Sequence, residues 1–125
     1  SMIHEIMHMI DYTTETDNLS SSYKFRKIIN RYRKVTDSLV ENLSEDDLFK
    51  TSWNSSNKYN KDYYQSSKEI FARCGEIYIR QILGKDSSLV NGISNKILYP
   101  QDETLLSLIE EYYKNFIETN LEMAI

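Results

Sequence analysis

Apolar residues recur at intervals of three and four along most of this chain, which is the spacing that gives an α-helix one apolar face. The longest such run has apolar side chains at Phe25, Ile28, Ile29, Tyr32, Val35, Leu39, Val40 and Leu43. Only three glycines and one proline interrupt the 125 residues, so the chain has few of the residues that tight turns between strands require. The sequence therefore predicts an all-α fold.

The same spacing, together with capping residues, predicts where the helices begin and end. We expect helices over residues 2–12, 25–43, 66–83 and 87–98, and a final helix that starts after Asp102. Ser44, which three acidic residues follow, is typical of a helix N-cap, and Gly84 is typical of a residue just past a helix C-terminus. Residues 13–22 and 53–61 are rich in polar residues and are expected to be loops.

Composition narrows the class of function. The net charge of -4 argues against a nucleic-acid-binding protein, and the basic stretch of residues 24–34 is interpreted as the solvated face of a helix. No apolar run approaches the roughly 20 residues of a membrane helix, and no signal peptide precedes the first helix. Cys74 is the single cysteine, so no disulfide forms within the chain. We expect neither nucleic acid nor a membrane as a partner, while secreted and cytoplasmic locations both stay open.

The two histidines of the chain lie four residues apart, and a glutamate directly follows the first, in the segment His4-Glu5-Ile6-Met7-His8. On a helix, residues four apart lie on one face, so both imidazoles can reach the same metal ion. Glu5 would lie beside that face, where its carboxylate can take a proton from the attacking water. This HExxH pattern predicts a Zn²⁺ ion held by His4 and His8, with Glu5 as the general base. The alternative is a pair of surface histidines near a frayed helix end.

A catalytic zinc site needs a third protein ligand, and a later segment supplies a candidate. The pattern His4-Glu5-x-x-His8-x-x-Asp11, followed by an amphipathic helix and then Glu69-Ile70-Phe71-Ala72, resembles the catalytic domain of anthrax lethal factor over nearly the whole chain. It also resembles the secreted clostridial Pro-Pro endopeptidases and the peptidase-like domains carried on mobile elements. In these families the glutamate of the second segment binds zinc, which implies Glu69 as the third ligand.

Glu69 has an alternative interpretation and a competitor. A glutamate in the first turn of a helix stabilises the helix dipole without binding anything. Glu76 is the second candidate for the third ligand, although we expect it on a different face of the same helix from Glu69.

The resemblance also implies a tyrosine a few residues before the ligand glutamate, whose hydroxyl stabilises the oxyanion during hydrolysis. Tyr63 and Tyr64 are the candidates, although the family spacing falls on Asp62, and plain packing is the alternative for both. Asp11, one helical turn after His8, is a candidate to accept a hydrogen bond from the second nitrogen of a ligand histidine and so fix its tautomer. The alternative for Asp11 is an exposed residue at the helix end.

Peptidases of this class carry a small β-sheet before the HExxH helix, and its edge strand binds the substrate backbone. Only three residues precede His4, so we expect residues 1–125 to form a single helical, zinc-binding part of a longer zincin-like catalytic domain, with that sheet absent from this chain. The expected function is zinc-dependent hydrolysis of a peptide or protein substrate, with the missing N-terminal part of the domain as a candidate partner. The alternatives are a non-catalytic helical interaction module and an inactive fragment of a larger protein.

Overall fold

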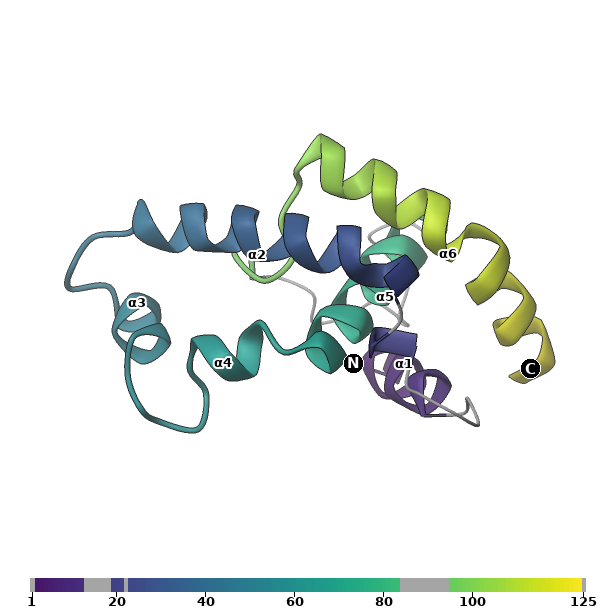
Figure 1. Cartoon of the computed structure of the whole chain (residues 1–125), viewed down its shortest axis with the longest axis horizontal. Coiled ribbons are helices and arrows are strands. Elements are labelled where there is room, and N and C mark those ends of the chain that lie inside the picture. The colour runs from purple at the N-terminus through teal and green to yellow at the C-terminus, as the bar shows by residue number, and fades with distance from the viewer. Residues whose placement is uncertain (1, 13–18, 22, 84–94, 125) are drawn as a thin grey trace.

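The structure, a computed structural model, describes residues 2–12, 19–21, 23–83 and 95–124, with side chains up to Lys114 in the last range. Every regular element within these ranges is a helix, so the predicted all-α fold is confirmed (Figure 1). The elements are α1 (Met2–Asp11), η1 (Leu19–Ser21), η2 (Tyr23–Phe25), α2 (Arg26–Glu41), α3 (Leu48–Trp53), α4 (Lys61–Tyr64), α5 (Ser67–Leu83) and α6 (Glu103–Ala124), where η marks a 3₁₀-helix. None of the described helices has the length and apolar character needed to cross a bilayer.

The long helices agree with the prediction to within two residues at each boundary that was predicted. Asp102 caps α6 as expected, because its Oδ2 accepts a hydrogen bond from the backbone N–H of Leu105 at 2.9 Å. Gly84 and most of the helix predicted over 87–98 lie outside the described residues. The described end of that segment is a turn, in which Asn95 Oδ1 accepts hydrogen bonds from the backbone of Ile97 at 2.8 Å and of Leu98 at 3.0 Å.

The short helix α3 was predicted only through an N-cap, and the short helix α4 was not predicted. Asp47 caps α3 by accepting hydrogen bonds from the backbone of Phe49 at 2.9 Å and of Lys50 at 3.2 Å. Ser44 instead donates to the Asp46 carboxylate, so the N-cap predicted at Ser44 is wrong by three residues. α4 begins at the last residue of the predicted loop 53–61 and lies before the helix predicted from residue 66. Helices of six and four residues are too short for a 3.6-residue period to be visible in the sequence.

The helix α5 forms the centre of the structure (Figure 1). Every residue from 69 to 79 is buried, because α1, η1 and α6 pack directly against this helix and α2 covers a further part of it. A helix that is buried on all sides is expected to be apolar all round. The charged exceptions within residues 69–79 are Glu69, Arg73 and Glu76, and these three residues contact the histidines of α1 or one another.

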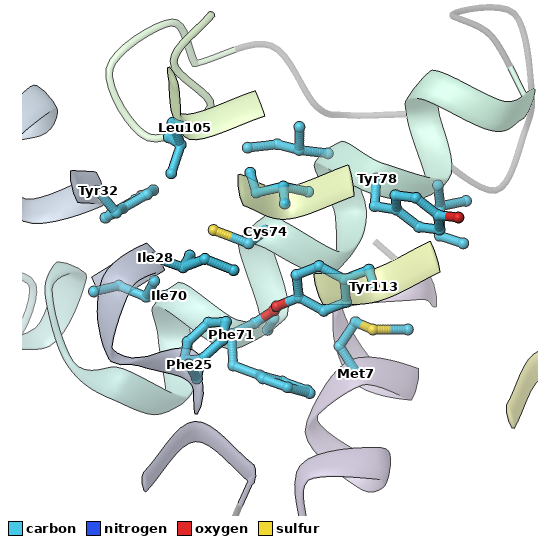
Figure 2. Packing of buried hydrophobic residues seen from close by; sticks show 14 of the residues in the cluster. Met7, Phe25, Ile28, Tyr32, Ile70, Phe71, Cys74, Tyr78, Leu105 and Tyr113 are labelled. Carbon is cyan, nitrogen blue, oxygen red and sulfur yellow. The ribbon is translucent and has the colours of Figure 1, made fainter. Parts of the chain in front are cut away.

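The core at the junction of α1, α5 and α6 contains a cluster of aromatic rings among isoleucine side chains (Figure 2). The ring of Phe71 lies 5.3 Å from that of Phe25 and 5.6 Å from that of Tyr113, and Met7 of α1 packs beside them. Tyr113 is fully buried, and its hydroxyl donates to the backbone oxygen of Phe71 at 2.8 Å. The aromatic cluster therefore fixes α6 against α5 without leaving a buried hydroxyl unsatisfied.

Hydrogen bonds from polar side chains connect the start of α6 and the end of α4 to α2. Arg31 forms a bidentate pair with Asp102, at 2.8 and 2.9 Å, which holds the start of α6 against α2. Arg33 donates to the backbone oxygen of Gln65, and the Gln65 side chain donates in turn to Thr36 and Asp37. These bonds fix the end of α4 relative to α2, and thereby place Tyr63 and Tyr64.

Removal of the Phe71 ring is expected to destabilise the protein strongly. Phe71→Ala should lower the free energy of unfolding by about 3–5 kcal/mol, because it leaves a cavity between α1, α5 and α6. Leu48→Ala removes a large side chain that is 86% exposed, and should change stability by no more than about 0.5 kcal/mol. Urea unfolding followed by circular dichroism measures both, and equal costs for the two variants would contradict this account of the core.

Candidate metal centre

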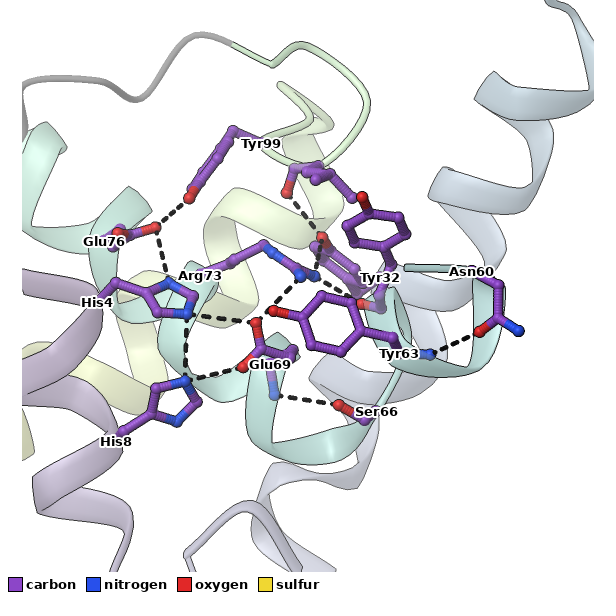
Figure 3. Close-up of polar contacts among 12 residues, drawn as sticks. His4, His8, Tyr32, Asn60, Tyr63, Ser66, Glu69, Arg73, Glu76 and Tyr99 are labelled. Carbon is purple, nitrogen blue, oxygen red and sulfur yellow. Dashed lines mark hydrogen bonds and ion pairs between the residues drawn. The ribbon is translucent and has the colours of Figure 1, made fainter. Parts of the chain in front are cut away.

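The imidazoles of His4 and His8 lie side by side on α1 (Figure 3). Ile3, Met7 and Ile10 form the buried stripe of this helix, and the histidines lie along the edge of that stripe. Their Nε2 atoms are 3.1 Å apart, and the rings meet edge to face with centroids 4.7 Å apart. Glu5 lies between them in the sequence and is exposed on the same helix. The four-residue spacing therefore directs both rings towards one point, as the HExxH pattern predicts.

Glu69, in the first turn of α5, points its carboxylate at both histidines. Its Oε2 lies 2.8 Å from His8 Nε2, and its Oε1 lies 3.3 Å from His4 Nε2. His4, His8 and Glu69 each offer a donor atom within 4.8 Å of the other two. The fold thus brings together, from helices far apart in the chain, the three residues that the sequence analysis assigned to the metal.

The spacing of these donor atoms fits a tetrahedral zinc ion. Ligands of such an ion lie about 3.4 Å from one another, since Zn–N and Zn–O bonds are about 2.0–2.2 Å long. The two histidine Nε2 atoms are 3.1 Å apart, and each lies close to a different oxygen of the Glu69 carboxylate, at 3.3 Å for His4 and 2.8 Å for His8. Two imidazole nitrogens and one carboxylate are also the donor set of one well-known class of catalytic zinc site. The residues therefore fit the ion in both chemistry and geometry.

The charges of His4 and Glu69 shift each other's protonation equilibria, and the charge of Glu76 acts on His4 as well. Burial alone would lower the pKa of His4, but hydrogen bonds to Glu69 and Glu76 and their negative charges outweigh it and raise that pKa to about 9. Burial alone would raise the pKa of Glu69, but the hydrogen bond to His4 and the charges of His4 and Arg73 lower it to about 2. The metal-free cluster thus holds a proton on His4 at neutral pH, and a metal ion has to displace that proton.

Arg73 holds the Glu69 carboxylate from one helical turn further along α5. Its Nη2 lies 3.3 Å from Glu69 Oε1, and its Nη1 donates to the backbone oxygen of Tyr64 at 2.6 Å and to the Tyr32 hydroxyl at 3.3 Å. The Arg73 side chain is only 4% exposed. The sequence analysis did not single out Arg73. The sequence feature that could have indicated a role for Arg73 is its position four residues after a candidate ligand, in a segment that is otherwise mostly apolar.

Glu76 lies on the same face of α5 as Glu69, so the expectation that it would face elsewhere is wrong. Seven residues make almost two full turns of an α-helix, and they return to within about 20° of the starting direction. Glu76 is fully buried, and its Oε2 lies 3.4 Å from His4 Nδ1. The hydroxyl of Tyr99 donates to the same carboxylate oxygen. Glu76 therefore contacts the second nitrogen of His4, on the side of the ring away from Glu69.

Asp11 has a different role from the one predicted. It is fully buried, and its Oδ1 accepts a hydrogen bond from the backbone N–H of Ser20 at 2.7 Å. This bond ties η1 to the end of α1. The sequence analysis sought in Asp11 a contact with the second nitrogen of a ligand histidine, and in the structure Glu76 makes such a contact with His4. The alternative of an exposed Asp11 is wrong as well. A distant backbone N–H captures the carboxylate, which sequence spacing cannot indicate.

The two candidate tyrosines have different surroundings. The ring of Tyr64 stacks on Trp53 at 6.0 Å and lies 5.5 Å from Phe49, so it belongs to an aromatic cluster with α3. The hydroxyl of Tyr63 lies beside the Glu69 carboxylate (Figure 3). Burial, the negative charge of Glu69 and a hydrogen bond to it raise the pKa of Tyr63. Of the two candidates, Tyr63 is thus the one whose hydroxyl reaches the candidate ligand Glu69.

A pocket of about 400 Å³ borders the centre. It is lined by His4, Tyr59, Tyr63, Tyr64, Glu69 and Arg73. The pocket therefore connects two of the three candidate ligands with a wall of aromatic rings, and leaves space for a bound molecule beside them.

Comparison with known proteins identifies the family of this chain. No curated protein and no solved structure matches it. The sequence model of the family described as large polyvalent protein-associated domain 1 matches residues 55–123, which include α4, α5 and most of α6. This finding supports the predicted resemblance to domains of mobile-element proteins in its general form, and gives no match to lethal factor or to Pro-Pro endopeptidases. Because the match covers more than half of the sequence, the chain belongs to the large polyvalent protein-associated domain 1 family.

Proposed function

We propose that this chain binds zinc and contributes the metal centre of a metalloendopeptidase. The observation that carries the proposal is the convergence of His4, His8 and Glu69, whose donor atoms lie within 4.8 Å of one another. The two histidines come from α1 and the glutamate from α5, so the arrangement depends on the fold and is more than a chance pair of neighbours in the sequence. The exposed fractions of 18%, 21% and 11% leave the three side chains accessible to an ion.

A catalytic role for the metal fits this cluster better than a structural one. Structural zinc sites are usually closed by four protein ligands, whereas catalytic sites have three and an open position. The cluster found among the described residues has three members, and the pocket lies directly beside two of them. Cys74, the only cysteine, is fully buried with a raised pKa, so it is neither a ligand nor a nucleophile here.

Each residue then has a defined task in peptide hydrolysis. Zinc, when bound, would polarise the scissile carbonyl and acidify the attacking water. Glu5 would take the proton from that water and pass it to the leaving amine. The Tyr63 hydroxyl would donate a hydrogen bond to the oxyanion that develops on the carbonyl oxygen. Arg73 would keep the Glu69 carboxylate aimed at the histidines.

The substrate is proposed to be a peptide or protein. The resemblance to peptidases implies an edge strand that binds the substrate backbone. No strand occurs within residues 2–12, 19–21, 23–83 and 95–124, so that strand is proposed to come from additional protein joined to this chain. The aromatic pocket then provides contacts for one side chain of the substrate.

Purified protein should contain one zinc ion per chain. His8→Ala and Glu69→Ala should reduce the zinc content to near zero, because two remaining ligands hold zinc poorly. Glu5→Gln should keep a full equivalent, because Glu5 does not bind the metal directly in this proposal. Inductively coupled plasma mass spectrometry measures all four proteins. A wild-type protein without zinc, or a His8→Ala variant that retains one equivalent of zinc, would contradict the proposal.

The rate of peptide hydrolysis should distinguish the roles of Tyr63 and Tyr64. Tyr63→Phe removes a hydroxyl beside the metal centre and should lower kcat about 10²–10³-fold, the usual effect of losing one oxyanion donor. Tyr64→Phe removes a hydroxyl from a ring that packs on Trp53, and should leave kcat within about twofold of wild type. Both variants should retain zinc. Peptide-library cleavage by the longest natural form of the protein gives kcat, and a larger loss for Tyr64→Phe would contradict the assignment.

A non-catalytic helical interaction module is the second candidate function. The observation that favours it is the extent of the family match, which begins at residue 55 and therefore excludes both histidines. In this case α4, α5 and α6 would serve as a scaffold within a larger polyvalent protein. His4→Ala and His8→Ala would then leave both the metal content and the function of the protein unchanged, which the zinc measurement decides directly.

A further inference from the structure

The Glu76 carboxylate is the most deeply buried charged group next to the candidate metal centre. It is 0% exposed, in the middle of the central helix α5. Burial of a carboxylate is costly unless charged or hydrogen-bonding groups surround it. The His4 ring and the Tyr99 hydroxyl are among such groups around Glu76. Because burial of Glu76 costs free energy and its carboxylate contacts a candidate ligand, we expect a role for Glu76 at the candidate metal centre.

Once a metal ion has displaced the extra proton and His4 is neutral, the position of Glu76 favours one nitrogen of the ring as the one that carries the hydrogen. A neutral imidazole has one N–H donor and one nitrogen lone pair. Glu76 Oε2 lies 3.4 Å from Nδ1, while Nε2 faces Glu69 and His8. An acceptor at Nδ1 favours the tautomer with hydrogen on Nδ1 and the lone pair on Nε2. That lone pair is directed at the point where the three candidate ligands converge.

Tyr99 holds Glu76 in this position. The Tyr99 hydroxyl donates to Glu76 Oε2, the same oxygen that faces His4. Tyr99 itself belongs to the turn before α6, where its backbone N–H bonds to Asn95. The preceding residue, Leu98, is fixed by the Tyr32 hydroxyl, which donates to its backbone oxygen at 2.7 Å. The turn is therefore anchored to α2, and Tyr99 presents its hydroxyl from a fixed position.

We propose that Glu76, held by Tyr99, is a positioning residue that orients His4 and fixes its tautomer for metal binding. This inference rests on the proposed role of His4 as a zinc ligand. It assigns to Glu76 the contact that sequence spacing had suggested for Asp11. It also gives the turn before α6 a function in the metal centre, although this turn lies more than 90 residues after His4 in the sequence.

Zinc affinity tests the proposal without any need for a substrate. Glu76→Gln should weaken zinc binding about 10–100-fold, the usual effect of removing a group that orients a metal ligand. Tyr99→Phe should weaken it in the same direction, because the carboxylate loses the bond that holds it. Competition with a fluorescent chelator gives the Kd of each purified variant, and thermal unfolding shows whether each is folded.

Two matched variants serve as controls. Tyr113→Phe removes a buried hydroxyl that bonds to the Phe71 backbone, and Glu111→Gln neutralises an exposed glutamate of α6. Both should leave the zinc Kd within about twofold of wild type, because neither group touches a candidate ligand. If Glu76→Gln does not fold, the comparison of Tyr99→Phe with Tyr113→Phe decides the question.

A spectroscopic readout separates positioning from general stability. Long-range ¹H–¹⁵N correlation spectra of the metal-free wild type, at a pH high enough for His4 to be neutral, should show His4 with its hydrogen on Nδ1, and Glu76→Gln should lose that single tautomer. An unchanged Kd for both Glu76→Gln and Tyr99→Phe, with the His4 tautomer preserved, would overturn the positioning role while leaving the zinc proposal intact. A wild-type protein that binds no zinc would overturn both.

Discussion

The packing of α1 against α5 is the interaction on which the rest of this structure depends. These two helices contact each other more extensively than any other pair of described elements. Ile3, Met7 and Ile10 enter the core, and this burial fixes the rotation of α1 about its axis. Because His4 and His8 lie at the edge of the buried stripe, the same rotation directs both imidazoles towards the first turn of α5. Hydrophobic burial therefore positions the polar site.

The central helix combines a buried environment with three charged side chains. Glu69, Arg73 and Glu76 are spaced by four and three residues, so they form one stripe along α5. Burial of isolated charges at these positions would cost several kcal/mol each. Partners from α1, the end of α4 and the turn before α6 offset this cost. The stripe is thus stable only in the assembled fold, and the cluster forms when these segments come together.

The α3–α4 segment lies beside the candidate metal centre and contributes aromatic side chains near it. The α3–α4 segment carries Trp53, Tyr63 and Tyr64, and hydrogen bonds through Gln65 hold its end against α2. The family match covers this segment from residue 55 and continues through α5, so it includes the tyrosines and Glu69 but not the histidines. The tertiary structure joins the family-defining part of the chain to α1, and the candidate metal centre lies at their junction.

The sequence by itself determined the all-α fold, the extent of the long helices and the cap at Asp102, because apolar periodicity and capping are local properties of the chain. It also placed His4 and His8 on one helical face, and the resemblance to zinc peptidases pointed to Glu69 as their partner. Only the tertiary structure decided that Glu76, and not Asp11, meets the second nitrogen of His4, and that Tyr63 turns towards the centre while Tyr64 packs on Trp53. These choices depend on contacts between segments far apart in the chain, such as Ser20 with Asp11 and Tyr99 with Glu76. Spacing along the sequence carries no information about such contacts, because packing of the helices sets which side chains meet.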